Sequence, residues 1–307
     1  MKFYSSGKLL ITGEYLILKG ASALAVPLNC GQSLEVNDEP GIDLLKWKSL
    51  EKGKLWFECN INTKLFEIIS SSDREKADYV LRLLKAAVDL SPQFAEAIVR
   101  KSIKTDSDFE LKWGFGSSSS LISNVAYWAN TDPFKLHKSI SEGSGYDVVT
   151  ARQNGPVFFQ ISKKNFSVKK ATFRPVFRDR IYFVYLGRKQ DTAKNIDSFL
   201  KNKKPYRVET RVISELTRHL ALSKTLKDFE FYMKEHEQLI ASVLRRKTLK
   251  ETRFKNLDGE VKSLGAWGGD FAMLTWNRTK EELINYLHEI KIDTLFSFDE
   301  LIKQGEI

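Results

Sequence analysis

The sequence W-G-F-G-S-S-S-S at residues 113–120 places a glycine-rich turn directly before a helical pattern. Gly114 and Gly116 let the backbone adopt positive φ and approach a ligand closely. Four apolar residues follow at the spacing of one helix face: Leu121, Val125, Trp128 and Ala129. The serines then form the first helical turn, whose unpaired N–H groups and dipole favour an anion. The stretch therefore predicts an anion site, most simply a phosphate site.

A flexible connection is the alternative interpretation of this run of glycine and serine. The turn is not a Walker loop, because no lysine follows its last glycine, and it lacks the G-x-G-x-x-G spacing of dinucleotide-binding turns. The phosphate interpretation therefore depends on what the rest of the chain contains.

The composition is that of an ordinary globular protein with one large domain or two average ones. The 307 residues are 42% hydrophobic and 29% charged. No apolar run approaches the roughly 18 residues that cross a bilayer, and Met1 leads into a strand-like segment rather than a signal peptide. Because Cys30 and Cys59 are the only cysteines, a disulfide framework is not expected. We expect a soluble, cytoplasmic protein.

The net charge of +10 suggests an anionic partner, either nucleic acid or small anionic substrates. Lysine and arginine are scattered in short groups, without one long basic tract and without the aromatic interleaving of an RNA-recognition signature. We therefore expect no nucleic-acid partner and no membrane partner. Phosphorylated metabolites, or simply a solvated basic surface, account for the charge.

Hydrophobic periodicity and turn residues predict a mixture of strands and helices, and hence an α+β fold. Strand-like segments lie at residues 2–11, 14–18, 23–26, 33–36, 55–59, 94–103, 108–113, 157–161 and 181–186. The first of them is expected to be interrupted by a turn at Gly7 and to resume at residues 9–11. Helical patterns begin at a capping box in residues 72–75, at Pro133, and at residues 208 and 226, and a hairpin is expected at 262–275. Residues 163–170 are polar and basic, as expected of a crossing between domains. His236 lies on the inward face of the last helix, where a core histidine is commoner than a catalytic one.

The sequence G-S-G-Y-D at residues 143–147 contains a second candidate for chemistry. Its two glycines allow a tight turn before a new helix, which would hold Asp147 at the edge of a concave site. A helix N-cap is the alternative, because aspartate is a preferred residue there. Residues 187–196 also enter a helix, with Asp191 or Thr192 as the cap.

Three separated motifs, taken in order, resemble those of the GHMP kinases, the family of galacto-, homoserine, mevalonate and phosphomevalonate kinases. Residues 5–18, S-S-G-K-L-L-I-T-G-E-Y-L-I-L, resemble the family element A-P-G-K-x-x-x-x-G-E-[HY]. The glycine-rich turn resembles the phosphate loop P-x-x-x-G-L-G-S-S-A-A, with Ser119 and Ser120 at the alanines and without the upstream proline. Residues 143–147 resemble the element G-S-G-[FY]-D. The resemblance extends from residue 2 to about residue 275.

This resemblance implies roles for the matching residues. Lys8 would stabilise the transferring phosphoryl group, and Asp147 would orient the acceptor and hold Lys8 or take its proton. Ser118 would bind Mg²⁺ through its hydroxyl. The phosphates of ATP would lie against five residues of the loop: Gly114, Gly116, Ser117, Ser118 and Ser119. Taken without the motifs, Lys8 reads as a surface lysine beside an edge strand.

Further matches imply an acceptor site formed by Tyr15, Ser144, Gly145, Thr192, Gly268, Gly269 and Asp270. The hairpin K-S-L-G-A-W-G-G-D at 262–270 resembles the family pattern K-x-[ST]-G-A-G-G-G-[GD], except that Trp267 replaces a glycine. An unusual acceptor pocket, or a nucleotide site partly covered by the indole, would follow. Helix-cap chemistry at Thr192 and hairpin-turn chemistry at Asp270 are the alternatives.

The resemblance implies a two-domain α+β fold. Residues 1–165 would form an N-terminal, ribosomal-protein-like domain that carries the phosphate loop and a left-handed crossover. Residues 166–307 would form a ferredoxin-like C-terminal domain.

The implied function is transfer of the γ-phosphoryl group of ATP, with Mg²⁺, to mevalonate or phosphomevalonate in the pathway to isoprenoid precursors. The partners would be ATP and a small-molecule acceptor, and a homodimer is allowed. A diphosphomevalonate decarboxylase is an alternative within the same fold. A degenerate, non-catalytic GHMP binding protein is another, because residues 133–140 contain no glutamate to act as the second magnesium ligand of mevalonate kinases.

Overall fold

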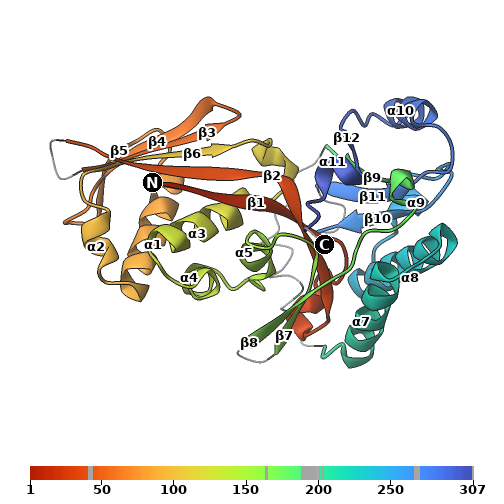
Figure 1. Ribbon diagram of the computed structural model, residues 1–307. Helices are drawn as coiled ribbons and strands as arrows, with labels where there is room; N and C mark the ends of the chain where they lie inside the picture. Colours follow the sequence, from red (N-terminus) through yellow and green to blue (C-terminus); the bar gives the residue numbers. More distant parts are fainter. Residues whose placement is uncertain are drawn as a thin grey trace. The chain divides into compact units, whose positions relative to one another are not determined.

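The computed structural model describes residues 1–40, 44–162, 165–187, 199, 201, 204–265 and 270–305 (Figure 1). The chain divides into two compact units. Unit 1 comprises Met1–Gly7, Cys30–Leu111 and Phe115–Arg152, and unit 2 comprises Lys8–Asn29, Lys112–Gly114 and Gln153–Ile307. The chain therefore passes between the units after residues 7, 29, 111, 114 and 152. The domains predicted from the sequence, 1–165 and 166–307, are regions expected to fold independently. They stay a prediction, because the two compact units are defined by contacts and not by independent folding.

Unit 1 contains a mixed sheet in the order β5-β4-β3-β6-β2. Its strands are β2 (Ala23–Asp38), β3 (Leu44–Glu51), β4 (Lys54–Asn62), β5 (Glu67–Ser71) and β6 (Lys101–Ser107). Neighbours are antiparallel except β3 and β6, which run parallel. Strand β1 (Lys2–Leu10) pairs with β2, and both strands continue from one unit into the other. Strand β1 continues through Gly7, so the turn predicted there is wrong, and β2 covers both segments predicted at 23–26 and 33–36.

The helices of unit 1 gather on one side of this sheet (Figure 1). They are α1 (Arg74–Leu90), α2 (Phe94–Ala97), α3 (Ser117–Trp128), α4 (Pro133–Ile140) and α5 (Tyr146–Thr150). Helix α1 buries an apolar stripe that includes Ala77, Val80 and Leu84, as its periodicity predicts. The predicted capping box is wrong by one residue, because Asp73 occupies the N-cap and its side chain accepts from the Lys76 N–H.

Unit 2 contains an antiparallel sheet in the order β10-β11-β9-β12. These strands are β9 (Ile181–Tyr185), β10 (Val261–Leu264), β11 (Phe271–Thr275) and β12 (Leu295–Ser297). The helices are α7 (Arg207–Ala221), α8 (Leu226–Leu244), α9 (Leu249–Thr252), α10 (Lys280–Glu289) and α11 (Phe298–Leu301). Side chains of the sheet, such as Val184 and Leu274, form one core with Leu283 and Leu287 of α10. The predicted hairpin and both predicted long helices are confirmed.

A second β segment of unit 2 pairs β7 (Val157–Ser162) with the first part of β2 and with β8 (Asn165–Lys170). Residues 165–170 are therefore a strand, and their interpretation as a polar crossing is wrong. Three short 3₁₀ helices complete the described chain: η1 (Leu16–Lys19), η2 (Leu111–Trp113) and η3 (Arg178–Arg180).

Three strand predictions are wrong for local reasons. Residues 108–113 are not a strand, because β6 ends at Ser107 and the chain bends there before it enters η2. Residues 14–18 turn into η1, because Gly13 and Tyr15 both have positive φ, 90° and 59°, and the chain cannot remain extended there. Residues 94–97 form α2, at whose start the Phe94 N–H donates to the Ser91 carbonyl, and β6 begins only at Lys101. The α+β class is confirmed. Both cysteines are free, and none of the described helices combines the length and apolar character needed to span a bilayer.

Candidate functional site

The glycine-rich turn enters α3 as the sequence predicts. Gly116 is the N-cap residue and adopts a left-handed conformation, with φ 89° and ψ 42°. The hydroxyls of Ser119 and Ser120 donate to the Gly116 carbonyl at 2.9 and 3.1 Å, so these buried side chains close the first turn of the helix. Ser117 and Ser118 instead line a pocket. The loop therefore offers two hydroxyls to a ligand, together with the N–H groups of the helix N-terminus.

This pocket lies within unit 1 and has a volume of about 380 Å³. Besides the two serines, its walls include Lys76, Tyr79 and Arg82 of α1 and Trp56 of β4. The three α1 residues are spaced three apart, so they follow one side of α1 next to its buried stripe, and Val80 of that stripe also lines the pocket. The Lys76 ammonium lies 5.8 Å from the centroid of the Trp56 ring. The pocket thus joins a helix N-terminus, two cations, the carboxyl group of Glu75 and an aromatic surface, and Lys76 also forms an ion pair with Asp73.

Tyr79 connects α1 to the glycine-rich turn. Its hydroxyl lies 2.6 Å from Oγ of Ser118, which is a short hydrogen bond. Burial raises the pKa of Tyr79, the bond to Ser118 opposes that change, and the charge of Asp147 adds to it. Tyr79 therefore interacts with both Ser118 and Asp147 in unit 1.

Asp147 is the second residue of α5 and does not cap it. The N-cap is Gly145, with φ 78°, and the Asp147 carboxylate accepts from the Val148 N–H at 3.0 Å. Oγ of the buried Ser144 accepts weakly from the Tyr146 N–H at 3.4 Å. Nζ of Lys138 donates to the Gly143 carbonyl at 2.7 Å; burial lowers its pKa, and the negative charge of Asp147 raises it. A carboxylate at the start of α5 and an exposed cation of α4 thus lie close to this turn.

Lys8 lies in unit 2, where its Nζ is 3.4 Å from the carbonyl oxygen of Gly114. Gly114 has φ 70°, and a Cβ atom there would collide with the Asp270 carboxylate. The predicted residues Lys8, Gly114 and Asp270 are therefore near one another within this unit. Three other predicted residues, Thr192, Gly268 and Gly269, and also Trp267, lie outside the described residues.

Tyr15 sits on a strained turn of unit 2 that a buried ionic network holds in place. The Gly13 N–H donates to Nε2 of His236 at 3.0 Å, and the Glu14 carboxylate forms an ion pair with Lys262. Glu14, Lys262 and His236 are all at most 2% exposed. Burial and the Lys262 charge lower the pKa of His236 well below its ordinary value, so the ring is neutral and accepts at Nε2. His236 is a core histidine, as predicted.

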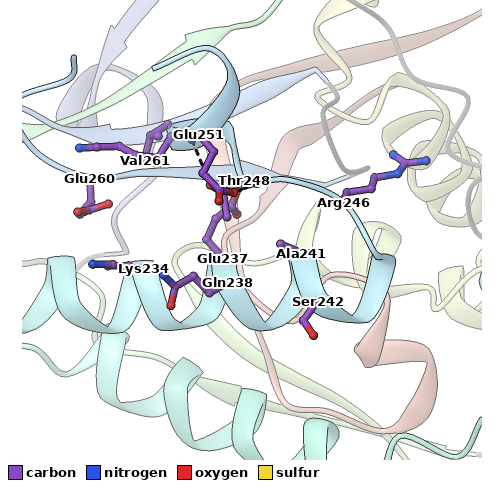
Figure 2. A pocket seen from close by; sticks show the side chains of 11 residues that line it. Lys234, Glu237, Gln238, Ala241, Ser242, Arg246, Thr248, Glu251, Glu260 and Val261 are labelled. Atoms are coloured by element: carbon purple, nitrogen blue, oxygen red, sulfur yellow. Dashed lines mark hydrogen bonds between the residues drawn. The ribbon is translucent and has the colours of Figure 1, made fainter. Parts of the chain in front are cut away.

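A second pocket, of about 440 Å³, belongs to unit 2 and lies between α8, α9 and the start of β10 (Figure 2). Glu237 lies at its centre, Lys234 and Glu260 at one end and Arg246 at the other (Figure 2). Burial raises the pKa of Glu237 to about 7, against the opposing charge of Lys262. Glu237 accepts from the Ser263 N–H at 3.0 Å, and the neighbouring Lys250 donates to the Leu257 carbonyl at 2.9 Å. Glu237 and Lys250 therefore already have hydrogen-bond partners within the protein.

The pocket face of α1 was missed from the sequence, although a signal for it exists. Lys76, Tyr79 and Arg82 recur at every third position, so an aromatic residue lies between two cations along one edge of the buried stripe. The contact of Tyr79 with Ser118 joins residues 39 positions apart, and that of Glu14 with Lys262 joins residues 248 apart. Neither contact leaves a local pattern.

The described residues contain no group of three histidine, cysteine, aspartate or glutamate side chains that could hold a metal ion. The donor set in the unit 1 pocket nevertheless suits one cation. A hydroxyl such as that of Ser118 is a hard oxygen donor, and Mg²⁺ is commonly bound by one or two protein groups together with phosphate oxygens and waters. A metal that arrives with a nucleotide fits this pocket, whereas a site made only of protein ligands does not.

No protein-family model matches the sequence, and no curated protein matches it either. Solved structures do match over nearly the whole chain. Methanococcus jannaschii mevalonate kinase matches with a TM-score of 0.68 at 16% identity, over 99% of this chain and 98% of that one. Streptococcus pneumoniae phosphomevalonate kinase, in complex with phosphomevalonate and AMPPNP, matches with a TM-score of 0.69 at 18% identity, over 97% of this chain and 100% of that one. Lactococcus lactis galactokinase, complexed with galactose, matches with a TM-score of 0.66 at 12% identity, over 99% and 94%.

Proposed function

Because the chain has the two-domain fold of the GHMP kinases, we propose that it is an ATP-dependent kinase of small molecules. The observation that carries this proposal is the unit 1 pocket, in which Ser117 and Ser118 at the start of α3 face Tyr79 and two cations. Its volume of about 380 Å³ lies within the range of pockets that bind small molecules.

ATP suits the chemistry of this pocket. The N–H groups of the first turn of α3, and the hydroxyls of Ser117 and Ser118, would bind phosphate oxygens, and Lys76 and Arg82 would offset their charge. Trp56 offers an aromatic face to a base. When bound, Mg²⁺ would neutralise charge on the phosphates, with Ser118 as its protein ligand.

The catalytic roles belong to Asp147 and Lys8 in this proposal. Asp147 would accept a hydrogen bond from the acceptor hydroxyl and orient its oxygen for attack on the γ-phosphorus. Its position after the N-cap Gly145 leaves the carboxylate with one described backbone partner, the Val148 N–H. Lys8 would offset negative charge that develops on the transferring group.

We propose mevalonate or phosphomevalonate as the acceptor. Two of the matching solved structures are kinases of these compounds, and Tyr15, Ser144, Gly145 and Asp270 occupy positions of acceptor motifs. Thr192, Gly268 and Gly269 belong to the same proposal through the sequence. Diphosphomevalonate decarboxylase is the second candidate, because its phosphorylation step would need the same groups. A non-catalytic binding protein is the third, because the described residues hold no metal cluster.

The test is ADP release with Mg·ATP and a panel of acceptors: mevalonate, phosphomevalonate, diphosphomevalonate, homoserine and galactose. Asp147→Asn removes the acceptor-orienting charge and should lower kcat by roughly 10²- to 10⁴-fold, while the Kd for nucleotide changes less than about threefold. Asp89→Asn, at an exposed position of α1, is the matched control and should retain wild-type turnover.

Turnover of one acceptor that disappears in Asp147→Asn would name the substrate, and release of CO₂ would mark the decarboxylase. Nucleotide binding without turnover of any acceptor would favour the non-catalytic protein. An Asp147→Asn variant with wild-type kcat would refute the role given to Asp147.

A further inference from the structure

The hydroxyl of Ser118 has a single partner among the described residues. Whereas Ser119 and Ser120 bond back to the Gly116 carbonyl, Ser118 Oγ bonds only to the Tyr79 hydroxyl at 2.6 Å. A serine side chain has three staggered rotamers, which differ in where the hydroxyl points. The contact with Tyr79 selects one of them.

The phenol is the better donor of this pair, because it is much more acidic than an aliphatic hydroxyl. A phenol keeps its proton at neutral pH. With Tyr79 as donor, Ser118 retains one lone pair and its own proton for other partners.

We propose that Tyr79 is a positioning residue, which holds the Ser118 hydroxyl in the rotamer that binds Mg·nucleotide. The proposal rests on the proposed kinase function and assigns Tyr79 a role that acts through Ser118. Tyr79 is suited to it because α1 is anchored by its buried stripe, with Ala77 and Val80 on either side of the tyrosine. The tyrosine oxygen is therefore fixed to a rigid element, whereas the serine lies beside a glycine turn.

Tyr79→Phe removes only the hydroxyl and keeps the ring, so the wall of the pocket stays filled. Loss of one selected rotamer and one hydrogen bond should raise the Kd for Mg·ADP about three- to tenfold. The readout is isothermal titration calorimetry, which requires no turnover. Without Mg²⁺ the effect should be smaller, because Ser118 then has no metal to bind.

A double-mutant cycle separates positioning from direct contact. If Tyr79 acts through Ser118, Tyr79→Phe should have no further effect on Kd in a Ser118→Ala background. The matched control is Tyr127→Phe, which removes an exposed hydroxyl from α3 and should leave Kd unchanged. Thermal unfolding of each variant monitors the fold independently.

Three results would overturn the proposal. Wild-type Kd in folded Tyr79→Phe would show that the hydroxyl positions nothing. An equal loss in the Ser118→Ala background would show that Tyr79 contacts the nucleotide itself. Absence of nucleotide binding by the wild type would refute the kinase function, and the role of Tyr79 with it, whereas the first two results leave the kinase function standing.

Discussion

At the level of single residues, the carboxyl group of Glu237 makes stability depend on pH. Its pKa in the folded protein is about 7, above the ordinary value of 4.5. The folded state therefore holds the proton more tightly, and its advantage is full below pH 4.5 and is lost as the pH rises through 7. Glu237 alone should lower the free energy of unfolding by up to about 3 kcal/mol over that interval.

Urea unfolding at several pH values between 5 and 8 checks this expectation. Glu237→Gln cannot ionise, so its free energy of unfolding should fall less over this range than that of the wild type. Glu235→Gln, two positions earlier on α8, should keep the wild-type dependence. Parallel curves for wild type and Glu237→Gln would place the pH dependence elsewhere.

Residues whose type and spacing form a local pattern could be predicted from the sequence. Gly116 and the serines of α3 were predicted from the turn, and Asp147 was predicted beside Gly145, although as one of two alternatives. Tyr79 and the pairing of Glu14 with Lys262 could not be predicted, because they arise only when distant segments pack together. Burial also gives Glu237 its raised pKa, and no pattern of neighbours in the sequence indicates that burial.

At the level of elements, Gly145 shows how closely α4 approaches the start of α5. Its φ is 78°, and a Cβ atom there would lie 2.7 Å from the Phe134 ring. Gly53, in the turn between β3 and β4, has nearly the same φ, 77°, and no atom within 4 Å of such a Cβ. A comparison of substitutions at Gly53 and Gly145 therefore separates the cost of backbone strain from the cost of steric crowding.

Gly53→Ala should cost about 1 kcal/mol of unfolding free energy, the strain of a left-handed alanine. Gly145→Ala should cost about 2 to 4 kcal/mol, because the Phe134 ring must also move. Chemical denaturation of the two variants measures the difference directly. Equal losses of unfolding free energy would mean that the Phe134 ring moves aside at no energetic cost.

Elements with strong periodicity were predictable, and those set by backbone strain were not. Helices α3, α7 and α8 and the β10-β11 hairpin follow from apolar spacing and turn residues. The segment 14–18 looked like a strand because its residues favour strands, yet positive φ at Tyr15 directs it into η1. Tertiary contacts of that turn, from His236 and Lys262, override the local preference.

At the level of the whole molecule, β1 and β2 belong to both compact units. Neither unit can lose its structure without breaking hydrogen bonds along strands that the other unit uses. We therefore expect the most protected amides of both units to exchange with the same free energy of opening. Native-state hydrogen exchange in rising urea tests this. Two separate plateaus, one for each unit, would contradict it.

The five passages of the chain between the units also bear on how such a gene can change. Unit 2 draws on three separate stretches of the sequence, so one recombination event cannot exchange it as an intact block. A fragment that ends at Arg152 would carry residues 8–29 without the rest of the unit in which they are packed. Exchange of one whole unit therefore requires several breakpoints, whereas a single crossover would replace parts of both units.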